Sequence, residues 1–185
     1  MNRHTFALFF LLSAAMLASC SGTQKSCVTR VTVDAFSMCL EDGWEQITEA
    51  DLRAKGVPEE TIAAFHLTEK RGGQRDNIVV SRENLPGEVS SRAYASANAK
   101  AVAGQPEYKL IEQRDVKVGG DVTMLHIFSA KPVPDLPVRR FYQLSLTAGT
   151  KGYTFTGTLP YAVENDIEQS LIDMLASVTV ATEEK

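Results

Sequence analysis

The chain has 185 residues, and its 23 acidic and 19 basic residues give a formal net charge of −4 at pH 7. This acidic balance argues against a nucleic-acid partner, which requires a basic surface, and against membrane binding through a polybasic patch. The length is sufficient for one domain with its own hydrophobic core.

The first twenty residues resemble the signal peptide and lipobox of bacterial lipoproteins. Arg3 carries the only formal charge, residues 6–18 form a run of apolar or small residues, and Cys20 follows. A membrane-spanning helix needs about 20 apolar residues, so this shorter run is typical of a signal peptide. The resemblance implies that residues 1–19 are removed and that Cys20 is acylated, which would hold the protein to a membrane through its lipid. The alternative is an ordinary secretory signal, with Cys20 incidental.

Ser21 follows the expected acylation site. An aspartate at this position retains Gram-negative lipoproteins at the inner membrane, so the resemblance predicts the outer membrane, facing the periplasm. Residues 20–26 then form a short polar tether. We expect residues 27–185 to form a single domain, because no low-complexity linker or repeat interrupts them.

The three cysteines fit the same compartment. With Cys20 assigned to lipid, Cys27 and Cys39 remain as one pair in an oxidising space. A turn at Asp34 and Ala35 predicts a hairpin that brings them opposite each other, and a disulfide closing a loop of this size stabilises by about 3 kcal/mol. Free thiols are the alternative, since the chain has no C-x-x-C motif and no histidine near these cysteines to complete a zinc site.

Helix signals appear first after this hairpin. Thr48, with Asp51 three residues later, predicts a short helix that ends at Gly56. Pro58, at a first-turn position, predicts a second helix through Phe65.

Two longer helices are expected further along the chain. Ser90 or Ser91 can cap an alanine-rich helix that ends at Gly104. Residues 163–176 form the clearest helix, and we expect it to close the core. Its apolar stripe consists of Val163, Ile167, Leu171, Met174 and Leu175, while Glu164, Asp166, Glu168 and Asp173 are expected on the solvent side.

The remaining β-rich runs predict strands at 77–82, 108–118, 121–129, 138–148 and 153–159. Short glycine-containing turns between neighbours require antiparallel pairing. Apolar residues occupy both alternating sets in 121–129, so we expect that strand to be central and covered on both faces. In 153–159 threonines alternate with apolar residues, which predicts one better buried face. The fold class is therefore α+β, an antiparallel sheet sandwiched between helices.

The order of elements and several short sequence words resemble the PsbP-like fold, which includes DcrB-like bacterial lipoproteins. The resemblance implies an αβα sandwich without shared catalytic residues, whose members serve as accessory, assembly or binding modules. No functional residue is carried over by it. The words are Phe36-Ser37-Met38, Asp42-Gly43-Trp44, Asn77-Ile78-Val79-Val80, Tyr153-Thr154-Phe155-Thr156 and Met174-Leu175-Ala176-Ser177-Val178.

A search for catalytic or metal-binding motifs is nearly empty, so we expect no enzyme, no metal and no cofactor. His126 lies within an apolar strand, where a buried imidazole is the ordinary interpretation. A hydrolase using His126 with Ser129 or Ser145 is the alternative, and it requires an accessible imidazole near a carboxylate. His66 is expected near the end of the second helix.

One basic segment and one aromatic residue stand out. Lys70, Arg71 and Arg75 surround two glycines and could bind a partner, although a solvated loop has the same composition. Trp44, beside a turn, is expected to cover an edge of the core rather than to form an exposed binding platform. Arg139 and Arg140 are adjacent in a strand, so they point to opposite faces and form no common patch.

Together these observations predict a lipid-anchored, non-enzymatic binding or assembly module of the cell envelope, with an envelope protein as its partner. The alternative within binding proteins is a small-ligand carrier that uses a cleft between sheet and helices. The oligomeric state does not follow from the sequence.

Overall fold

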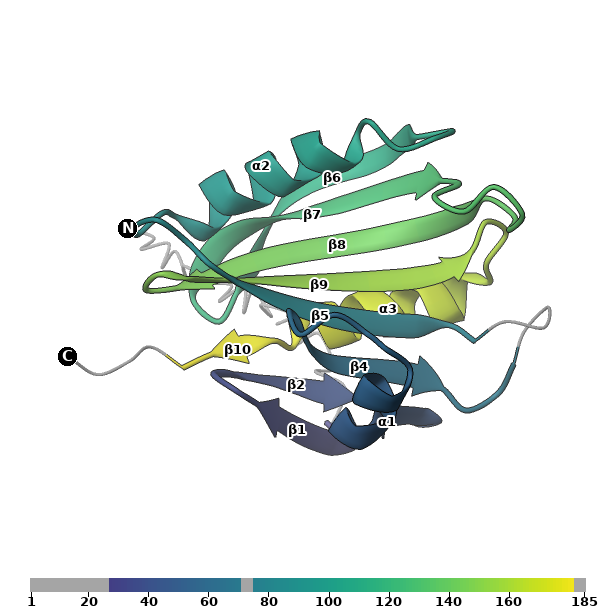
Figure 1. Ribbon diagram of the computed structural model, residues 1–185, viewed down its shortest axis with the longest axis horizontal. Helices are drawn as coiled ribbons and strands as arrows, with labels where there is room; N and C mark the ends of the chain where they lie inside the picture. The colour runs from purple at the N-terminus through teal and green to yellow at the C-terminus, as the bar shows by residue number, and fades with distance from the viewer. Residues whose placement is uncertain (1–26, 71–74, 182–185) are drawn as a thin grey trace, which may run out of the picture.

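The structure, a computed structural model, describes residues 27–70 and 75–181, so the expected signal peptide, Cys20 and Arg71 lie outside the described residues. Two antiparallel sheets and three helices make up the described part (Figure 1). This confirms the α+β class.

The larger sheet has seven strands in the order β3-β4-β5-β9-β8-β7-β6, and the smaller has the order β1-β2-β10. All pairings are antiparallel. The strands are β1 (Thr29–Val33), β2 (Phe36–Leu40), β3 (Trp44–Ile47), β4 (Thr61–Leu67), β5 (Asn77–Asn84), β6 (Lys109–Val118), β7 (Asp121–Ala130), β8 (Arg139–Ala148), β9 (Lys151–Pro160) and β10 (Thr179–Val180). The helices are α1 (Glu49–Ala54), α2 (Ser91–Val102) and α3 (Asn165–Ala176).

Helices α2 and α3 lie on opposite faces of the large sheet, as the two glycines of β9 show. A Cβ added at Gly152 would lie 2.5 Å from Cζ of Tyr94 in α2. A Cβ added at Gly157 would lie 2.7 Å from Cδ2 of Leu171 in α3. Because side chains alternate between faces along a strand, positions 152 and 157 point in opposite directions. The predicted sandwich is therefore confirmed.

The small sheet packs beside α3 on the same face of the large sheet (Figure 1). Phe36 of β2 contacts the core residues of β9, with its ring centroid 4.9 Å from that of Phe155 in an edge-to-face arrangement. Buried side chains from β2, β5, β8, β9 and α3 form one continuous core on this face. Helix α1 lies on the other face, at the β3–β4 edge, where it buries Leu52.

The prediction of a helix at Pro58–Phe65 is wrong, because this segment leads into strand β4. Ala63 and Phe65 both face the core, which fits a two-residue repeat instead of the helical spacing expected from Ile62 and Phe65. Pairing with β3 and β5 on either side satisfies the backbone of β4. His66 is accordingly a strand residue.

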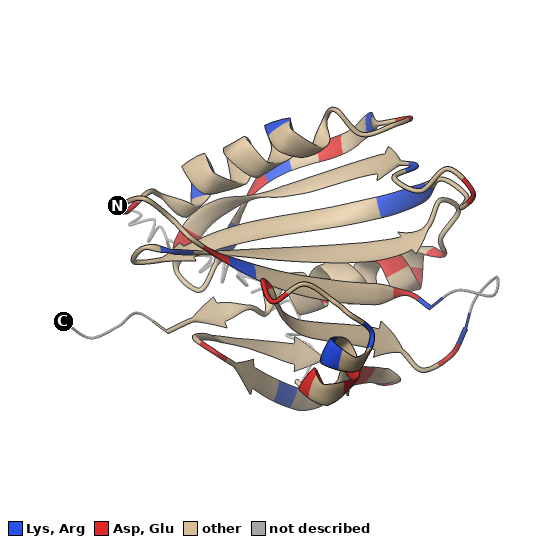
Figure 2. Ribbon diagram, in the orientation of Figure 1, with Lys and Arg blue, Asp and Glu red and all other residues tan. Residues whose placement is uncertain are grey.

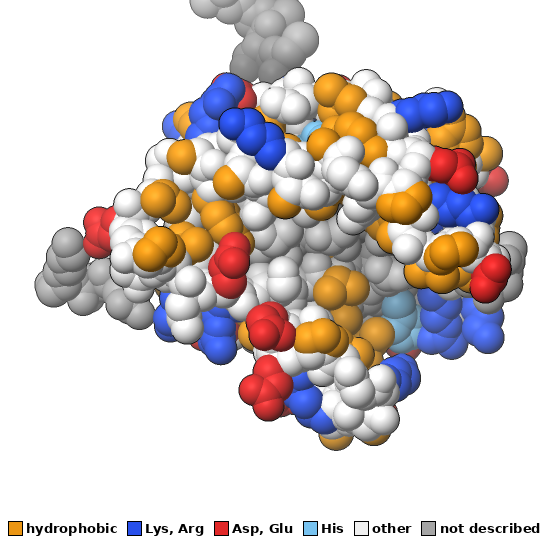
Figure 3. All heavy atoms as spheres, turned by 45° about the horizontal axis from the view of Figure 1, so that its top comes forward, with side chains coloured by type: hydrophobic (Ala, Val, Ile, Leu, Met, Phe, Trp, Pro, Cys, Tyr) orange, Lys and Arg blue, Asp and Glu red, His pale blue; other side chains and the backbone are white. Residues whose placement is uncertain are grey.

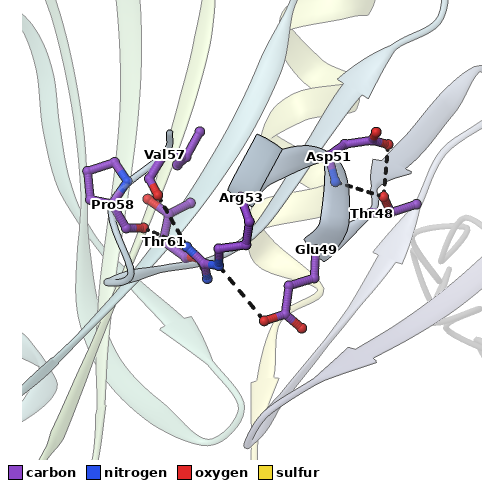
Figure 4. A network of polar contacts seen from close by, with 7 residues as sticks. All are labelled: Thr48, Glu49, Asp51, Arg53, Val57, Pro58 and Thr61. Carbon is purple, nitrogen blue, oxygen red and sulfur yellow. Dashed lines mark hydrogen bonds and ion pairs between the residues drawn. The ribbon is translucent and has the colours of Figure 1, made fainter. Parts of the chain in front are cut away.

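The turn between α1 and β4 explains why no second helix forms (Figure 4). Arg53 of α1 donates hydrogen bonds to three carbonyl oxygens, those of Val57, Pro58 and Thr61, at 3.1–3.2 Å. The Arg53 side chain thus holds these three carbonyls, and the backbone N–H of Thr61 closes a single turn on the Pro58 carbonyl before β4 begins. Gly56, with φ of +67°, ends α1 in the left-handed region that glycine tolerates. The predicted cap is confirmed, because Thr48 accepts a hydrogen bond from the backbone N–H of Asp51.

Strand β7 is not central as predicted, since it is second from the edge. It is nevertheless covered on both faces. Met124 packs against Ala95 and Ala99 of α2, while Leu125 and Ile127 belong to the core on the α3 side. Strand β9 is the middle strand of the seven. The short strands β3 and β10 were not predicted.

The predicted disulfide between Cys27 and Cys39 is confirmed, with a Cα–Cα distance of 5.4 Å. The predicted hairpin positions it, because Thr29 of β1 pairs with Leu40 of β2. Trp44 is buried at the start of β3, which confirms its structural role and contradicts an exposed platform.

Helix α3 closes the core, as expected from its apolar stripe. Leu171, Met174 and Leu175 are buried. The expectation that Glu168 is a solvated charge is wrong, because its carboxylate accepts hydrogen bonds from the Tyr142 hydroxyl at 2.6 Å and the Arg140 guanidinium at 3.0 Å. Glu168 therefore fastens α3 to β8.

We expect Leu171→Ala to lower the free energy of unfolding by about 2–5 kcal/mol, because it opens a cavity over Gly157. Gln169→Ala is the matched control, since Gln169 is exposed on the same helix and should change stability by no more than about 0.5 kcal/mol. Denaturant-unfolding midpoints of the two variants measure the difference. Equal midpoints would show that α3 is not part of the core.

Candidate functional site

A strip of the large sheet on the α2 face lies between α2 and α1 without a covering helix. We call this strip the α1–α2 groove. Its floor consists of the outward-facing side chains of β5 and β9, and its two walls are the helices. The polar floor residues are Asn77, Ser81, Thr154 and Thr156, with Gln143 from β8.

The groove comprises two hollows that adjoin along β5. The hollow beside α2 has a volume of about 320 Å³, and the one beside α1 about 660 Å³. Figure 3 shows this face hollowed in its middle, where white polar side chains and backbone predominate over orange apolar ones. Apolar side chains such as Leu52 and Val79 also line the hollow beside α1, so this part of the surface offers both hydrogen bonding and apolar contact.

The wall formed by α2 holds its polar groups in fixed positions. Asn98 donates hydrogen bonds to Ser145 Oγ at 3.0 Å and to Thr154 Oγ1 at 2.9 Å. The Tyr94 hydroxyl lies 3.1 Å from Thr154 Oγ1, and burial raises the pKa of Tyr94 so that the phenol stays neutral. This network is preorganised, and Thr156 lies next to it on the open part of the floor.

The hollow beside α1 contains most of the basic segment predicted to bind a partner. Lys70 and Arg75 are exposed and line it together with His66. Nη1 of Arg75 lies 2.9 Å from Nδ1 of His66. Lys55 of α1 lines the same hollow. The partner-binding role suggested for Lys70 and Arg75 stays a prediction, and the strand position of His66 was not foreseen.

The other end of the groove has acidic residues. Glu60 and Glu83 line the hollow beside α2. Figure 2 shows basic and acidic residues in both halves of the molecule, without a one-sided field. Glu45 and Asp51 also line the hollow beside α1, and Arg82 lines the one beside α2, so both ends of the groove carry charges of both signs.

A third hollow, of about 660 Å³, lies at the end of the sheet where β5 and β8 begin. Asp76 is fully buried there and forms an ion pair with Arg139, with 3.4 Å between Oδ1 and Nη2. Arg140 turns to the other face and binds Glu168, as predicted from strand alternation. No motif in the sequence identified Asp76, because its burial depends on strand pairing that is remote in sequence.

His126 does not meet the requirement of the hydrolase alternative. Its side chain is 2% exposed, burial lowers its pKa, and its Nε2 lies 3.0 Å from the Tyr108 hydroxyl instead of a carboxylate. Ser129 points to the other face of β7, and Ser145 binds Asn98. His126 is a core imidazole, as its apolar surroundings predicted.

Within residues 27–70 and 75–181, no cluster of three or more His, Cys, Asp or Glu side chains could hold a metal ion. None of the helices described there is long and apolar enough to cross a membrane.

No protein-family model matches the sequence, and no curated protein matches it closely enough to count as a relative. Solved structures share its fold, however. The cyanobacterial PsbP protein CyanoP from Synechocystis sp. PCC 6803 is similar with a TM-score of 0.59 at 18% identity, over 89% of this chain and 98% of that chain.

Two further structures are similar. LpqN of Mycobacterium tuberculosis, involved in cell envelope biogenesis, gives a TM-score of 0.55 at 10% identity over 83% of this chain and 90% of that chain. PA94 of Pseudomonas aeruginosa, a protein of unknown function and putative regulator, gives 0.55 at 16% identity over 85% and 98%. At these identities the likeness shows the fold alone. The chain therefore has the PsbP-like fold that its sequence words resemble.

The buried imidazole of His126 makes stability pH-dependent. Its folded pKa lies below the ordinary value of 6.5, so the unfolded chain binds more protons as the pH falls. Stability should be full above about pH 6.5 and should fall as the pH decreases from there toward the folded pKa. We expect His126→Gln to reduce this slope between pH 7.5 and 5.5 relative to the unsubstituted protein. Denaturant midpoints across this range are the measurement, and an unchanged slope in His126→Gln would contradict the assignment.

Proposed function

We propose that this chain is a lipid-anchored, non-enzymatic binding or assembly module of the cell envelope, and that its partner binds in the α1–α2 groove. The observation that carries the proposal is the polar floor of β5 and β9. On either side of this strip α2 and α1 cover the sheet, whereas here half-buried polar residues such as Asn77, Ser81 and Thr156 remain open to solvent.

The groove fits a polar partner better than a small enclosed ligand. Sites for small molecules are mostly apolar and bury most of the ligand surface. The α1–α2 groove is open to solvent, has polar side chains on its floor and carries charged residues at both ends, and these properties suit an extended polar segment of an envelope protein. The small-ligand carrier is therefore the less favoured alternative.

Three observations support a location outside the cytoplasm. The disulfide between Cys27 and Cys39 belongs to an oxidising compartment. LpqN, which shares the fold, is involved in cell envelope biogenesis. The N-terminal residues resemble a lipoprotein signal, which supports acylation of Cys20 and, through Ser21, an outer-membrane location facing the periplasm.

We expect the intact mass of the mature protein to include acyl chains on Cys20. Cys20→Ala should leave an unprocessed precursor that detaches more easily from membranes, because lipid chains supply the anchoring free energy. A wild-type mass without acyl chains would contradict the anchor.

Photo-crosslinking in the native envelope tests the groove. A photoreactive residue replacing Thr156 on the groove floor should yield a discrete protein adduct. The same residue replacing Thr32, an exposed threonine on β1 in the opposite layer, should not. The groove would not be the binding surface if Thr156 gave no adduct, or if both positions gave the same one.

A further inference from the structure

The large apolar side chains that remain exposed on the described surface are unevenly distributed. Six of eight lie at one end of the sandwich, which we call the tether end. These six are Val28, Leu110, Ile111, Val133, Leu136 and Tyr161, whereas Val89 and Val122 lie at the opposite end. Exposed apolar residues scattered singly are ordinary, so it is their gathering at one end that calls for an explanation.

The tether end is defined by contacts that bring distant segments together. The chain enters at Cys27, beside Leu40, and the following turn contacts β4, with Thr68 N–H donating to Gly43 O at 2.8 Å. Asp76 and Arg139 connect the starts of β5 and β8 at this end. Figure 1 shows the loop between β7 and β8 at the right, while β1 begins lower and nearer the middle, on the small sheet that packs beside this end.

The sequence between Cys20 and Cys27 limits how far this end can lie from the anchor. Seven residue steps span at most about 25 Å when fully extended. An acylated Cys20 therefore keeps Cys27, and with it the tether end, close to the lipid headgroups.

The loop between β7 and β8 is suited to an interfacial environment. It contains Pro132, Pro134 and Pro137, which have no backbone N–H to desolvate. The N–H of Leu136 already donates to Val133 O at 3.1 Å. The loop can thus place Val133 and Leu136 among headgroups with few unsatisfied donors.

We propose that the tether end rests on the bilayer surface, with Val133, Leu136 and Tyr161 inserted at the headgroup level. This proposal rests on the proposed acylation of Cys20. A bilayer fits the observations because these apolar residues come from several separate segments of the chain and do not line one pocket. The described acids and bases there are mixed, as in the Lys131–Glu107 pair at 4.0 Å, so the contact does not select anionic lipid.

Such a contact orients the groove. Strands of ten residues extend about 33 Å, so the far end of the sandwich with Val89 and Val122 would project away from the bilayer. A few inserted side chains would not bind a vesicle firmly by themselves. Because the lipid anchor already holds the protein at the membrane, the same side chains are sufficient to fix its orientation.

Spin-label accessibility on the acylated full chain in phosphatidylcholine and phosphatidylethanolamine vesicles tests the orientation. Leu136→Cys and Val89→Cys are matched, because the two native side chains are 42% and 43% exposed. With Cys20 acylated and Cys27 bonded to Cys39, each introduced thiol is the sole free one. The oxygen-to-nickel accessibility ratio should be several-fold higher at Leu136 than at Val89. Val133→Ser with Tyr161→Ser should reduce the ratio at Leu136.

Each other outcome contradicts the proposal. Equal ratios at the two positions, with acyl chains present in the intact mass, would overturn the orientation and leave the anchor intact. A mass without acyl chains would overturn the anchor and the orientation together. Shielding of Leu136 only in vesicles containing phosphatidylglycerol would show that charge, not apolar insertion, holds this end to the membrane. Shielding only in native envelopes would show that a protein contact covers it.

Discussion

Strand β9 is the constraint on which the sandwich depends, because a side chain from each helical layer packs directly against its backbone. A strand in the middle of a covered sheet normally keeps helices at a distance with its own side chains. Gly152 and Gly157 have no side chain. On opposite faces of the strand, Tyr94 of α2 and Leu171 of α3 therefore pack directly on the backbone at these glycines. Glycine weakens a strand because it has no side chain to pack, and these two close contacts offset that loss of stability.

The same strand separates the closed face from the open one. Its apolar residues, such as Tyr153 and Phe155, complete the core with α3 and β2. Its threonines face the other side, where α2 covers Thr154 and leaves Thr156 open. The core therefore uses only one face of β9. The other face can hold polar groups for a partner without loss of core packing. The groove and the fold are thus consequences of one alternating sequence.

Local signals in the sequence were sufficient for the elements that depend on local chemistry. The caps at Thr48 and Ser90, the stripe of α3 and the cysteine hairpin follow from short-range rules. The strand at 61–67 could not be predicted from such rules. Its alanine-rich run fits the spacing of a helix and of a strand, and only pairing with β3 and β5 decides between the two. The site was predicted only in part for the same reason. The threonine alternation of β9 was visible, but the uncovered strip depends on where α1 and α2 pack, and the burial of Asp76 depends on strand β8.

A double-mutant cycle between Gly157 and Leu171 tests the central role of β9 most directly. Gly157→Ala should destabilise the native protein, because the new methyl group would crowd Leu171. In the Leu171→Ala background the methyl group enters vacated space, so its cost should disappear or reverse, with a coupling free energy of about 0.5–3 kcal/mol. Additive effects, agreeing within about 0.5 kcal/mol, would contradict the account, because they would show that β9 and α3 do not meet at this glycine.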